Sequence, residues 1–212
     1  MNLLEALFQI QDDQDESLSF RYSCRGAVCG SCAMRVNGKL VLACRTHVED
    51  LLEKPTLIEP LPFFPVVRDL IVDMSTFFDH YQQIEPYLHG TPVPSDTEYK
   101  MEEDKRKEID PYIQCILCGI CFGVCPAFQR SSQFLGPAML AKAYRFLVDS
   151  RDRRFEEILK TADCLEGVWG CNTVFQCVKV CPKEVPPTHA IVRMRGKILR
   201  NRISSFISRL AR

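Results

Sequence analysis

The stretch Cys115-Ile-Leu-Cys118-Gly-Ile-Cys121-Phe-Gly-Val-Cys125-Pro126 decides how this chain folds. It places four thiols at the spacing C-x2-C-x2-C-x3-C, and a proline follows the last one. Cysteines two or three residues apart rarely meet disulfide geometry, whereas thiolates this close together converge readily on metal. The spacing is typical of iron–sulfur ligation, in which the fourth cysteine of the run binds a second cluster. A partner run is therefore expected elsewhere in the chain.

The partner run is Cys171-Asn-Thr-Val174-Phe-Gln-Cys177-Val-Lys-Val-Cys181-Pro182, which has the same register except that valine replaces the second cysteine. If the two runs exchange their fourth cysteines, a [4Fe–4S] cluster is assigned to Cys115, Cys118, Cys121 and Cys181. The other cluster receives Cys125, Cys171 and Cys177. Because Val174 offers no thiolate at the remaining corner, this cluster is predicted to be [3Fe–4S].

Cys164 is left without a cluster in this assignment. The favoured interpretation is that it behaves as a small buried hydrophobic residue. The alternative is that a loop brings it to the vacant corner and completes a second [4Fe–4S] cluster.

A third group of cysteines lies near the start of the chain and reads Cys24-Arg-Gly-Ala-Val-Cys29-Gly-Ser-Cys32, with Cys44 further on. This C-x4-C-x2-C…C pattern is the plant-type spacing for a [2Fe–2S] cluster. Gly26 and Gly30 are expected to let backbone amides approach the cluster, because glycine has no Cβ and tolerates positive φ. A zinc site is the competing interpretation, but zinc sites usually show paired C-x2-C units.

A hairpin is predicted to deliver the fourth ligand of this first site. Asn37-Gly38 stands between two short apolar segments and is a strong signal for a two-residue turn. In the register that the turn imposes, Val36 faces Lys39 and Cys32 faces Ala43. Cys44 then lies one step from Cys32.

Composition limits the remaining possibilities. The chain has 212 residues, 27 basic and 27 acidic, so no net charge favours nucleic acid. Twelve cysteines would suit a disulfide scaffold in a small secreted protein. This chain is larger, and residues 1–10 lack the basic start of a signal peptide. The longest uncharged run, residues 112–129, is too short and too polar to span a membrane. We therefore expect metal-bound thiolates in a reducing compartment.

The wide gap between Cys44 and Cys115 predicts two domains, residues 1–72 and 73–212. Residues 66–87 are largely helical in pattern, and the polar residues 88–110 are expected to form a solvated connection. Residues 193–212 contain seven Lys or Arg and no acid, with apolar residues at helical spacing. This basic amphipathic helix is expected either to dock on the domain core or to lie near anionic lipid or membrane subunits.

Beyond the cysteine runs, the chain resembles the iron–sulfur subunit of succinate dehydrogenase and fumarate reductase. The resemblance covers nearly the whole chain and preserves the order of the cluster ligands. It is carried by Ser-Cys-Arg-Gly-Ala-Val-Cys-Gly-Ser-Cys-Ala-Met at 23–34, Phe-Pro-Val-Val-Arg-Asp-Leu-Ile-Val-Asp-Met at 64–74, Cys-Ile-Leu-Cys at 115–118, Gly-Pro-Ala at 136–138, Ala-Tyr-Arg-Phe-Leu-Val-Asp-Ser-Arg-Asp at 143–152 and Val-Cys-Pro-Lys at 180–183.

The resemblance implies an α+β protein, with an N-terminal β-grasp [2Fe–2S] ferredoxin domain and a helical two-cluster domain of bacterial-ferredoxin type. It implies electron transfer between a flavoprotein subunit, which carries FAD, and quinone beside membrane-anchor subunits. The chain would sit as a peripheral protein on the cytoplasmic face of the cell membrane or the matrix face of the mitochondrial inner membrane. No dinucleotide fingerprint occurs in the chain, so neither flavin nor dicarboxylate is expected to bind it.

Several positions depart from the family pattern. Family members normally begin some thirty residues earlier, with a β-hairpin before the helix that matches residues 2–11. Either the chain is a fragment or has a misplaced start, or its N-terminal sheet is expected to lack two strands and expose an edge. The first cysteine loop usually reads Cys-Arg-Glu-Gly, whereas glycine comes one position early here. Succinate-oxidising members often place Trp shortly after the proline that matches Pro126 and His just after the cysteine that matches Cys171, whereas this chain has Ala-Phe-Gln-Arg at 127–130 and Asn172. By motif position, the residues expected near a quinone pocket are Pro126, Arg130, Asn172 and Val174.

Two other classes of protein remain open. One is a related electron-transfer subunit whose flavoprotein uses another donor, such as a thiol-linked fumarate reductase or a glycolate oxidase. Those relatives often carry two complete four-cysteine runs, so Val174 argues against them. The other is a zinc-binding interaction module with no redox role.

Overall fold

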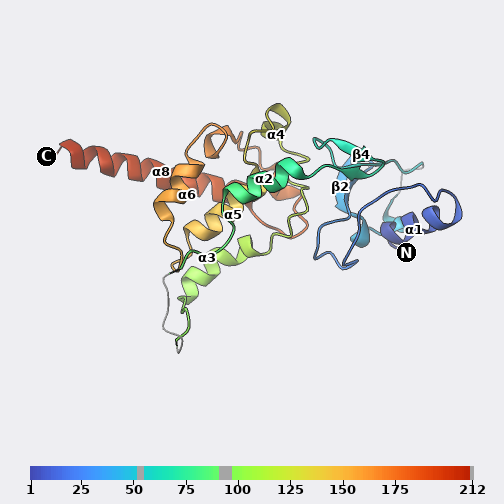
Figure 1. Ribbon diagram of the computed structural model, residues 1–212, viewed down its shortest axis with the longest axis horizontal. Helices are drawn as coiled ribbons and strands as arrows, with labels where there is room; N and C mark the ends of the chain where they lie inside the picture. Colours follow the sequence, from blue (N-terminus) through green and yellow to red (C-terminus); the bar gives the residue numbers. More distant parts are fainter. Residues whose placement is uncertain (52–54, 91–96, 211–212) are drawn as a thin grey trace.

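A computed structural model describes residues 1–51, 55–90 and 97–210 of the protein. Figure 1 shows an elongated molecule whose strands gather at one end and most of whose helices gather at the other. The N-terminus lies in the first of these halves, and the C-terminus is the far tip of the second. The mixture of helix and sheet expected from the sequence is confirmed.

The first helix is fixed by a reciprocal cap. α1 (Leu3–Asp13) begins after Asn2, whose side-chain oxygen accepts from the Glu5 amide at 2.9 Å. The Glu5 carboxylate accepts from the Asn2 amide at 2.8 Å, so two free donors of the helix start are satisfied. The buried face of α1 consists of Leu3, Leu4 and Leu7.

The main sheet follows the predicted hairpin. β1 (Ala33–Val36) pairs antiparallel with β2 (Lys39–Leu42) and, on its other side, with β3 (Ile58–Glu59). Asn37 and Gly38 form the turn with φ values of 46° and 77°. Val36 lies opposite Lys39, so the register predicted from the turn is confirmed.

The helical pattern expected over residues 66–87 is wrong in its first part. β4 (Val66–Arg68) and β5 (Ile71–Val72) form a short antiparallel pair, and only then does α2 (Ser75–Gln83) begin. Asp69, with φ at 45°, makes the turn, and its carboxylate accepts from the Ser19 amide at 2.8 Å. This distant contact holds the segment as a hairpin, so tertiary packing overrides the local pattern.

The helical half is built around one buried helix. α5 (Pro137–Leu147) is almost entirely buried and packs against α3, α6 and α8. The remaining helices are α3 (Glu103–Ile113), α4 (Pro126–Arg130), α6 (Phe155–Ala162), α7 (Gln176–Lys179) and α8 (Pro187–Leu210).

The charged end of residues 88–110, which were expected to form a solvated connection, is helical. α3 contains most of the charge run, and its charges pair along the helix as Glu103 with Lys107 at 2.7 Å and Arg106 with Asp110. These side chains are exposed, so the expectation of a solvated segment holds for them. Residues 91–96, which belong to the same connection, lie outside the described residues.

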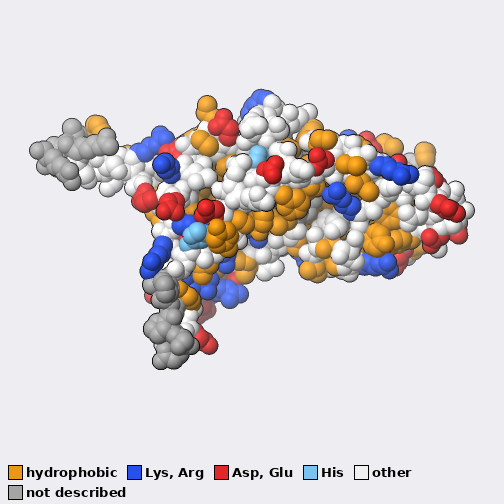
Figure 2. Space-filling model, viewed as in Figure 1, with side chains coloured by type: hydrophobic (Ala, Val, Ile, Leu, Met, Phe, Trp, Pro, Cys, Tyr) orange, Lys and Arg blue, Asp and Glu red, His pale blue; other side chains and the backbone are white. Residues whose placement is uncertain are grey.

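An aromatic cluster joins the two halves behind the cysteine loops. Phe122 contacts Phe77 of α2 and Phe128 of α4, each with ring centroids 4.8 Å apart. Phe64, which precedes β4, lies 5.7 Å from Phe128. Hydrophobic side chains also gather on the visible surface where the halves meet (Figure 2). The cysteine loops are therefore held on a packed apolar junction.

The predicted basic helix at the C-terminus is present as the outer part of α8, which is described to Leu210; residues 211–212 lie outside the described residues. Within the described part of the chain, no helix is both long enough and apolar enough to cross a membrane.

Candidate iron–sulfur cluster sites

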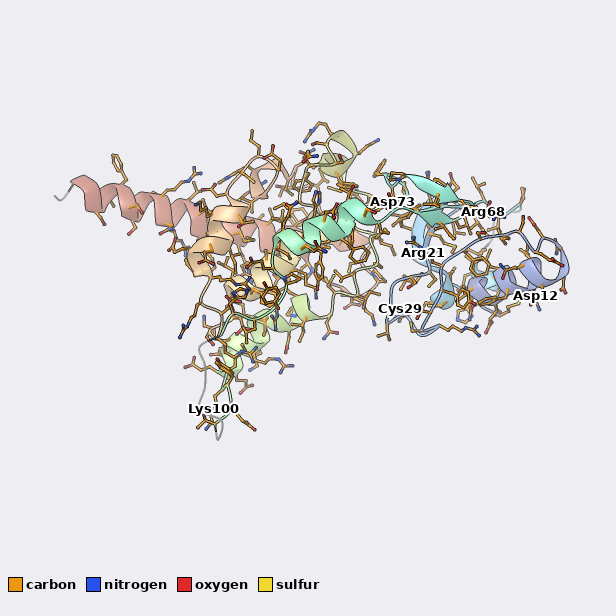
Figure 3. The ribbon with its side chains drawn as sticks, in the orientation of Figure 1. Asp12, Arg21, Cys29, Arg68, Asp73 and Lys100 are labelled. Carbon is orange, nitrogen blue, oxygen red and sulfur yellow. The ribbon has the colours of Figure 1, made fainter. Side chains whose placement is uncertain are left out.

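In the first cysteine loop, backbone amides point at a sulfur. Cys24 Sγ accepts hydrogen bonds from the N–H groups of Gly26, Val28 and Cys29 at 3.4, 3.2 and 3.2 Å. An anionic sulfur is stabilised by converging N–H donors. The loop therefore fits the requirement that an anionic cluster be wrapped by main chain, and Cys29 marks its place on the side of the N-terminal half that faces the helices (Figure 3).

The two glycines of this loop contribute in different ways. Arg25 and Ala27 take left-handed φ values of 54° and 55°, and Gly30 takes 73°, whereas Gly26 stays outside this region. The tolerance of glycine for positive φ is therefore used at Gly30 and not at Gly26. Gly26 contributes an N–H donor to the loop, and its neighbours on either side make the turns.

The second and third cysteines of this loop lie in different electrostatic surroundings. Burial opposes ionisation of the Cys29 thiol, but hydrogen bonds from Ser31 and from the Cys24 amide outweigh it and lower the pKa of Cys29 to about 6. Burial raises the pKa of Cys32 to about 11. The Ala43 amide donates to the Cys32 carbonyl at 3.0 Å, so the hairpin extends to the cysteines and brings Cys44 beside Cys32.

The second site is an apolar cavity lined by four cysteines from both runs. Cys115, Cys118 and Cys121 come from the first run, and Cys181 comes from the end of the second. Ile116, Leu117, Ile120 and Val185 are among the residues that complete the wall. The predicted exchange of fourth cysteines is therefore matched by the geometry: Cys181 lies with the first run.

Burial dominates the ionisation of the three thiols from the first run. It raises the pKa of Cys118 to about 12 and that of Cys121 well above its ordinary value, and it also raises the pKa of Cys115. Thiols in such a cavity ionise only when a cation compensates the buried charge. Four soft sulfur ligands in an apolar pocket suit iron, so the residues present fit a cluster.

The third site gathers the three cysteines that remain in the runs. Burial is the main cause of the raised pKa of Cys177, and the neighbouring thiols of Cys171 and Cys125 raise it further. Cys125 immediately precedes α4, and the Thr173 amide donates to Cys171 Sγ at 3.3 Å. Val174 projects from the same loop and is 48% exposed. The position that would hold a fourth thiolate therefore carries an apolar side chain open to the outside.

The three sites touch one another in sequence. A Cβ at Gly30, in the first loop, would lie 2.7 Å from Cys118 Cβ and 2.9 Å from the Ile116 carbonyl oxygen, in the second. The Cys177 thiol of the third site is near enough to raise the pKa of Cys121, as a smaller cause than burial and the thiols of Cys118 and Cys115. Redox centres held by these loops would therefore be neighbours, the first beside the second and the second beside the third.

The residues expected near a quinone lie on the exposed side of the third site. Arg130 Nη2, from the end of α4, donates to Asn172 Oδ1 at 3.2 Å, which joins the two cysteine runs. Both side chains are exposed, as is Val174, while Pro126 is half-buried at the start of α4. The fold therefore brings these four residues to one region, without enclosing the three exposed ones.

Two residues of α8 that contact the third site were not singled out from the sequence. Thr188 Oγ1 lies 3.1 Å from Cys177 Sγ, and Thr188 is only 1% exposed. Arg195, two turns later, donates to the carbonyls of Val168 and Cys171, each at 2.6 Å, and to Thr173 Oγ1 at 3.0 Å. A seven-residue spacing puts both on one side of a helix, and this periodicity was the available signal.

Cys164 is half-buried, where full burial was the favoured expectation. It follows α6, and its thiol donates to the Thr161 carbonyl at 3.6 Å. Within the described ranges, no three His, Cys, Asp or Glu side chains are grouped as the ligands of one metal ion would be. A cluster spreads its thiolates over two or more iron atoms, so its ligands surround a volume and not a point.

Known proteins match both halves of the chain. A family model described as a 2Fe-2S iron-sulfur cluster binding domain matches residues 1–79, and one described as a 4Fe-4S dicluster domain matches residues 112–185. The mitochondrial succinate dehydrogenase [ubiquinone] iron-sulfur subunit of Candida glabrata is 37% identical over 198 residues, covering 92% of this chain and 78% of that protein.

A solved structure shares the fold over almost the whole chain. A chain of the Mycobacterium smegmatis Sdh1 complex in the apo form superposes with a TM-score of 0.81 at 26% identity, covering 94% of this chain and 85% of that one. With two cluster-binding domains, a close relative across its length and this shared fold, the chain belongs to the family of succinate dehydrogenase iron–sulfur subunits, and its role is electron transfer.

Proposed function

We propose that the chain relays electrons between a flavoprotein subunit carrying FAD and membrane quinone, with three clusters held in line. Cys24, Cys29, Cys32 and Cys44 would hold [2Fe–2S]. Cys115, Cys118, Cys121 and Cys181 would hold [4Fe–4S], and Cys125, Cys171 and Cys177 would hold [3Fe–4S]. Each cluster, when bound, would accept and release one electron at a time.

The observation that carries this proposal is the unbroken series of contacts between the sites. Gly30 lies against Cys118, and the thiols of Cys121 and Cys177 interact. Electrons pass efficiently only between centres that lie close together. A chain with exposed loops at both ends of such a series suits a relay between two partners.

The ligand count at the third site supports [3Fe–4S]. Valine cannot hold iron through sulfur, and its exposed side chain leaves that corner without a thiolate. Cys164 is half-buried, and its thiol is hydrogen-bonded to a backbone carbonyl. These are the surroundings of a structural cysteine. We therefore keep the ligand set at three cysteines.

We assign a β-grasp ferredoxin domain to residues 1–72 and a helical two-cluster domain to residues 73–212. The three-stranded antiparallel sheet, with α1 packed against residues 43–45 directly after β2, supports the first assignment. The crossed cysteine runs, held between α4, α5 and α8, support the second. β5 ends at Val72, where the strand-rich half gives way to helices.

Quinone would approach the third site beside Pro126, Arg130, Asn172 and Val174. The Arg130–Asn172 hydrogen bond supplies polar groups that can orient a quinone oxygen, and Val174 supplies an apolar contact. Quinones reside in the membrane, so this side of the chain would face membrane-anchor subunits. The protein would then be peripheral, on the cytoplasmic face of a cell membrane or the matrix face of a mitochondrial inner membrane.

Electron paramagnetic resonance (EPR) of anaerobically purified protein, oxidised and then reduced with dithionite, tests the proposal. An oxidised-state signal from [3Fe–4S] is expected, followed on reduction by signals of the other two clusters. Cys177→Ser should remove the first signal, while Cys164→Ser should leave all three. Protein that holds zinc without acid-labile sulfide, or an oxidised spectrum without that signal, would overturn the assignment.

A further inference from the structure

The outer half of α8 stands clear of the body of the protein. Ile191, Met194 and Ile198 are buried and fix the inner half of the helix against the core. Beyond Ile198 the helix projects from the helical domain and ends at the far tip of the molecule (Figure 1). From 202 to 208 every side chain is exposed. The core therefore does not account for the apolar residues of this half.

These apolar residues form a stripe on a different side of the helix from the buried row. Its members are Val192, Leu199, Ile203, Phe206 and Ile207, which we call the outer stripe. Their exposed fractions range from 45% at Val192 to 63% at Phe206. With 3.6 residues per turn, spacings of seven, four and three keep them on one face. An unpartnered apolar row of this length indicates an interaction surface.

The outer stripe is open along its length and leads to the third cluster site. Gly196 lies between Val192 and Leu199, and a Cβ built there would meet nothing within 4 Å. One turn before Val192, the His189 ring packs edge-on against Phe175 at 5.5 Å between centroids. Phe175 follows Val174 in the third-site loop. One continuous surface therefore joins that loop to the tip of α8.

Charge indicates the chemistry of the partner. From Pro187 to the C-terminus the chain has no Asp or Glu. Arg200 borders the same shallow hollow as Ile203 and Ile207, together with two serines. Lys197, one turn back, is half-buried, with its ammonium 5.9 Å from the Phe155 ring centroid, and Arg202 pairs with Asp163, so Arg200 is the cation that borders the stripe in this hollow. An apolar stripe flanked by a cation and hydroxyl groups complements an anionic lipid surface, because such a surface offers acyl chains and phosphates together.

We propose that the outer stripe of α8 lies in the headgroup layer of an anionic bilayer, with Arg200 on lipid phosphates. This inference rests on the proposed function, in which the Val174 side of the chain faces the membrane. The outer stripe continues the surface beside Val174. α8 would therefore lie along the membrane surface and keep the third site facing the membrane. The anchoring is built into this chain and adds to that supplied by partner subunits.

Sedimentation of the full cluster-loaded chain with vesicles tests the inference. Wild-type protein is expected to bind phosphatidylglycerol vesicles and to ignore pure phosphatidylcholine vesicles. The double variant Ile203→Gln/Phe206→Gln should bind about tenfold more weakly or worse. Arg200→Gln should bind about fivefold more weakly, and the difference should shrink at high salt. The matched control is Val66→Gln/Val67→Gln, which removes equally exposed apolar residues from β4 and should bind as wild type.

Binding to neither vesicle, or equal binding to both, would overturn the inference. So would a chain that ignores vesicles but binds purified anchor subunits in detergent through Ile203 and Phe206, because the stripe would then be a protein contact. EPR of each sample separates the two proposals. Intact signals in a chain that ignores vesicles leave the relay standing, whereas a missing [3Fe–4S] signal refutes the relay whatever the vesicles show.

Discussion

The cysteine runs 115–125 and 171–181 have nearly the same backbone and different side chains. Leu117 and Gly119 take left-handed φ values of 55° and 78°, and the matching residues Thr173 and Phe175 take 59° and 60°. In the first run the Gly119 carbonyl accepts from two amides three and four residues later, at 2.9 and 3.2 Å. The Phe175 carbonyl does the same at 3.1 and 3.2 Å.

The runs differ most at one matching position, which is Cys118 in the first and Val174 in the second. Cys118 lines the apolar cavity of the second site, whereas Val174 is 48% exposed. The shared loop conformation therefore does not depend on a thiol at this position. The backbone sets where a ligand can stand, and one side chain sets whether a ligand is there.

The largest expected loss of electron transfer comes from a substitution that makes the first cysteine run resemble the second. Cys118→Val removes a thiolate from the middle of the three sites but keeps a side chain of similar size. Electron transfer from succinate to quinone in the assembled complex should fall to background, because both neighbouring sites connect through this one. The assay is quinone reduction, with Cys164→Val as the matched control. Unchanged turnover in Cys118→Val would show that the cysteine is not a ligand.

The next prediction concerns the contact at Gly30 between the first and second cluster sites. In Gly30→Ala the new Cβ meets backbone and side-chain atoms of Cys118 at 2.7–2.8 Å, and φ is +73°. Gly38→Ala has a similar φ of +77° but open space, so it isolates the backbone cost of about 1–2 kcal/mol. We expect Gly30→Ala to lower the free energy of unfolding by a further ~1–3 kcal/mol.

Anaerobic unfolding in denaturant measures both glycine variants side by side. The same two proteins can be compared for the rate at which the second cluster is reduced through the first, which only Gly30→Ala should slow. Equal stability losses would mean that the two cysteine loops do not press together at Gly30.

The hydroxyl at the third site should have a smaller effect. Thr188 lies 3.1 Å from Cys177 Sγ, and a thiolate ligand can only accept. Because this bond stabilises the more negative, reduced state, Thr188→Val should lower the reduction potential of the third cluster. A bond of about 1 kcal/mol corresponds to roughly 40 mV for one electron. Redox titration followed by EPR measures the shift.

Thr188→Ser keeps the hydroxyl and should restore the potential. The second cluster provides an internal reference, since Cys121 stands at the position that matches Cys177 and has no contact with Thr188 among the described hydrogen bonds. A shift of the same size in both clusters would assign the effect to general loosening of α8.

Much of the local architecture could be predicted from the sequence, because it depends on interactions between residues close together in the chain. The Asn37-Gly38 turn fixes its hairpin register, and this placed Cys44 beside Cys32. The exchange of Cys181 into the first run follows from cysteine spacing alone. Both are set by covalent reach and turn geometry, so they survive the rest of the fold.

Features that depend on distant partners were not predictable in this way. The strand pair β4–β5 carries a helical pattern, and its turn at Asp69 is held by Ser19, far away in sequence. Arg195 looked like one more cation of a basic helix, yet it binds the carbonyl of Cys171 at 2.6 Å. The seven-residue spacing from Thr188 to Arg195 indicates a shared helix face, but nothing in the sequence identifies the carbonyl that Arg195 binds.

The most direct measurement is the oxidised-state EPR spectrum of Val174→Cys, with Val174→Ala as the control for the loss of valine itself. If the two runs differ in chemistry through this one position, the new thiol should complete the third site. The [3Fe–4S] signal should then disappear in Val174→Cys as that site becomes [4Fe–4S], and it should persist in Val174→Ala. An unchanged [3Fe–4S] signal in Val174→Cys, with the other clusters intact, would contradict the assignment of position 174 to the open corner.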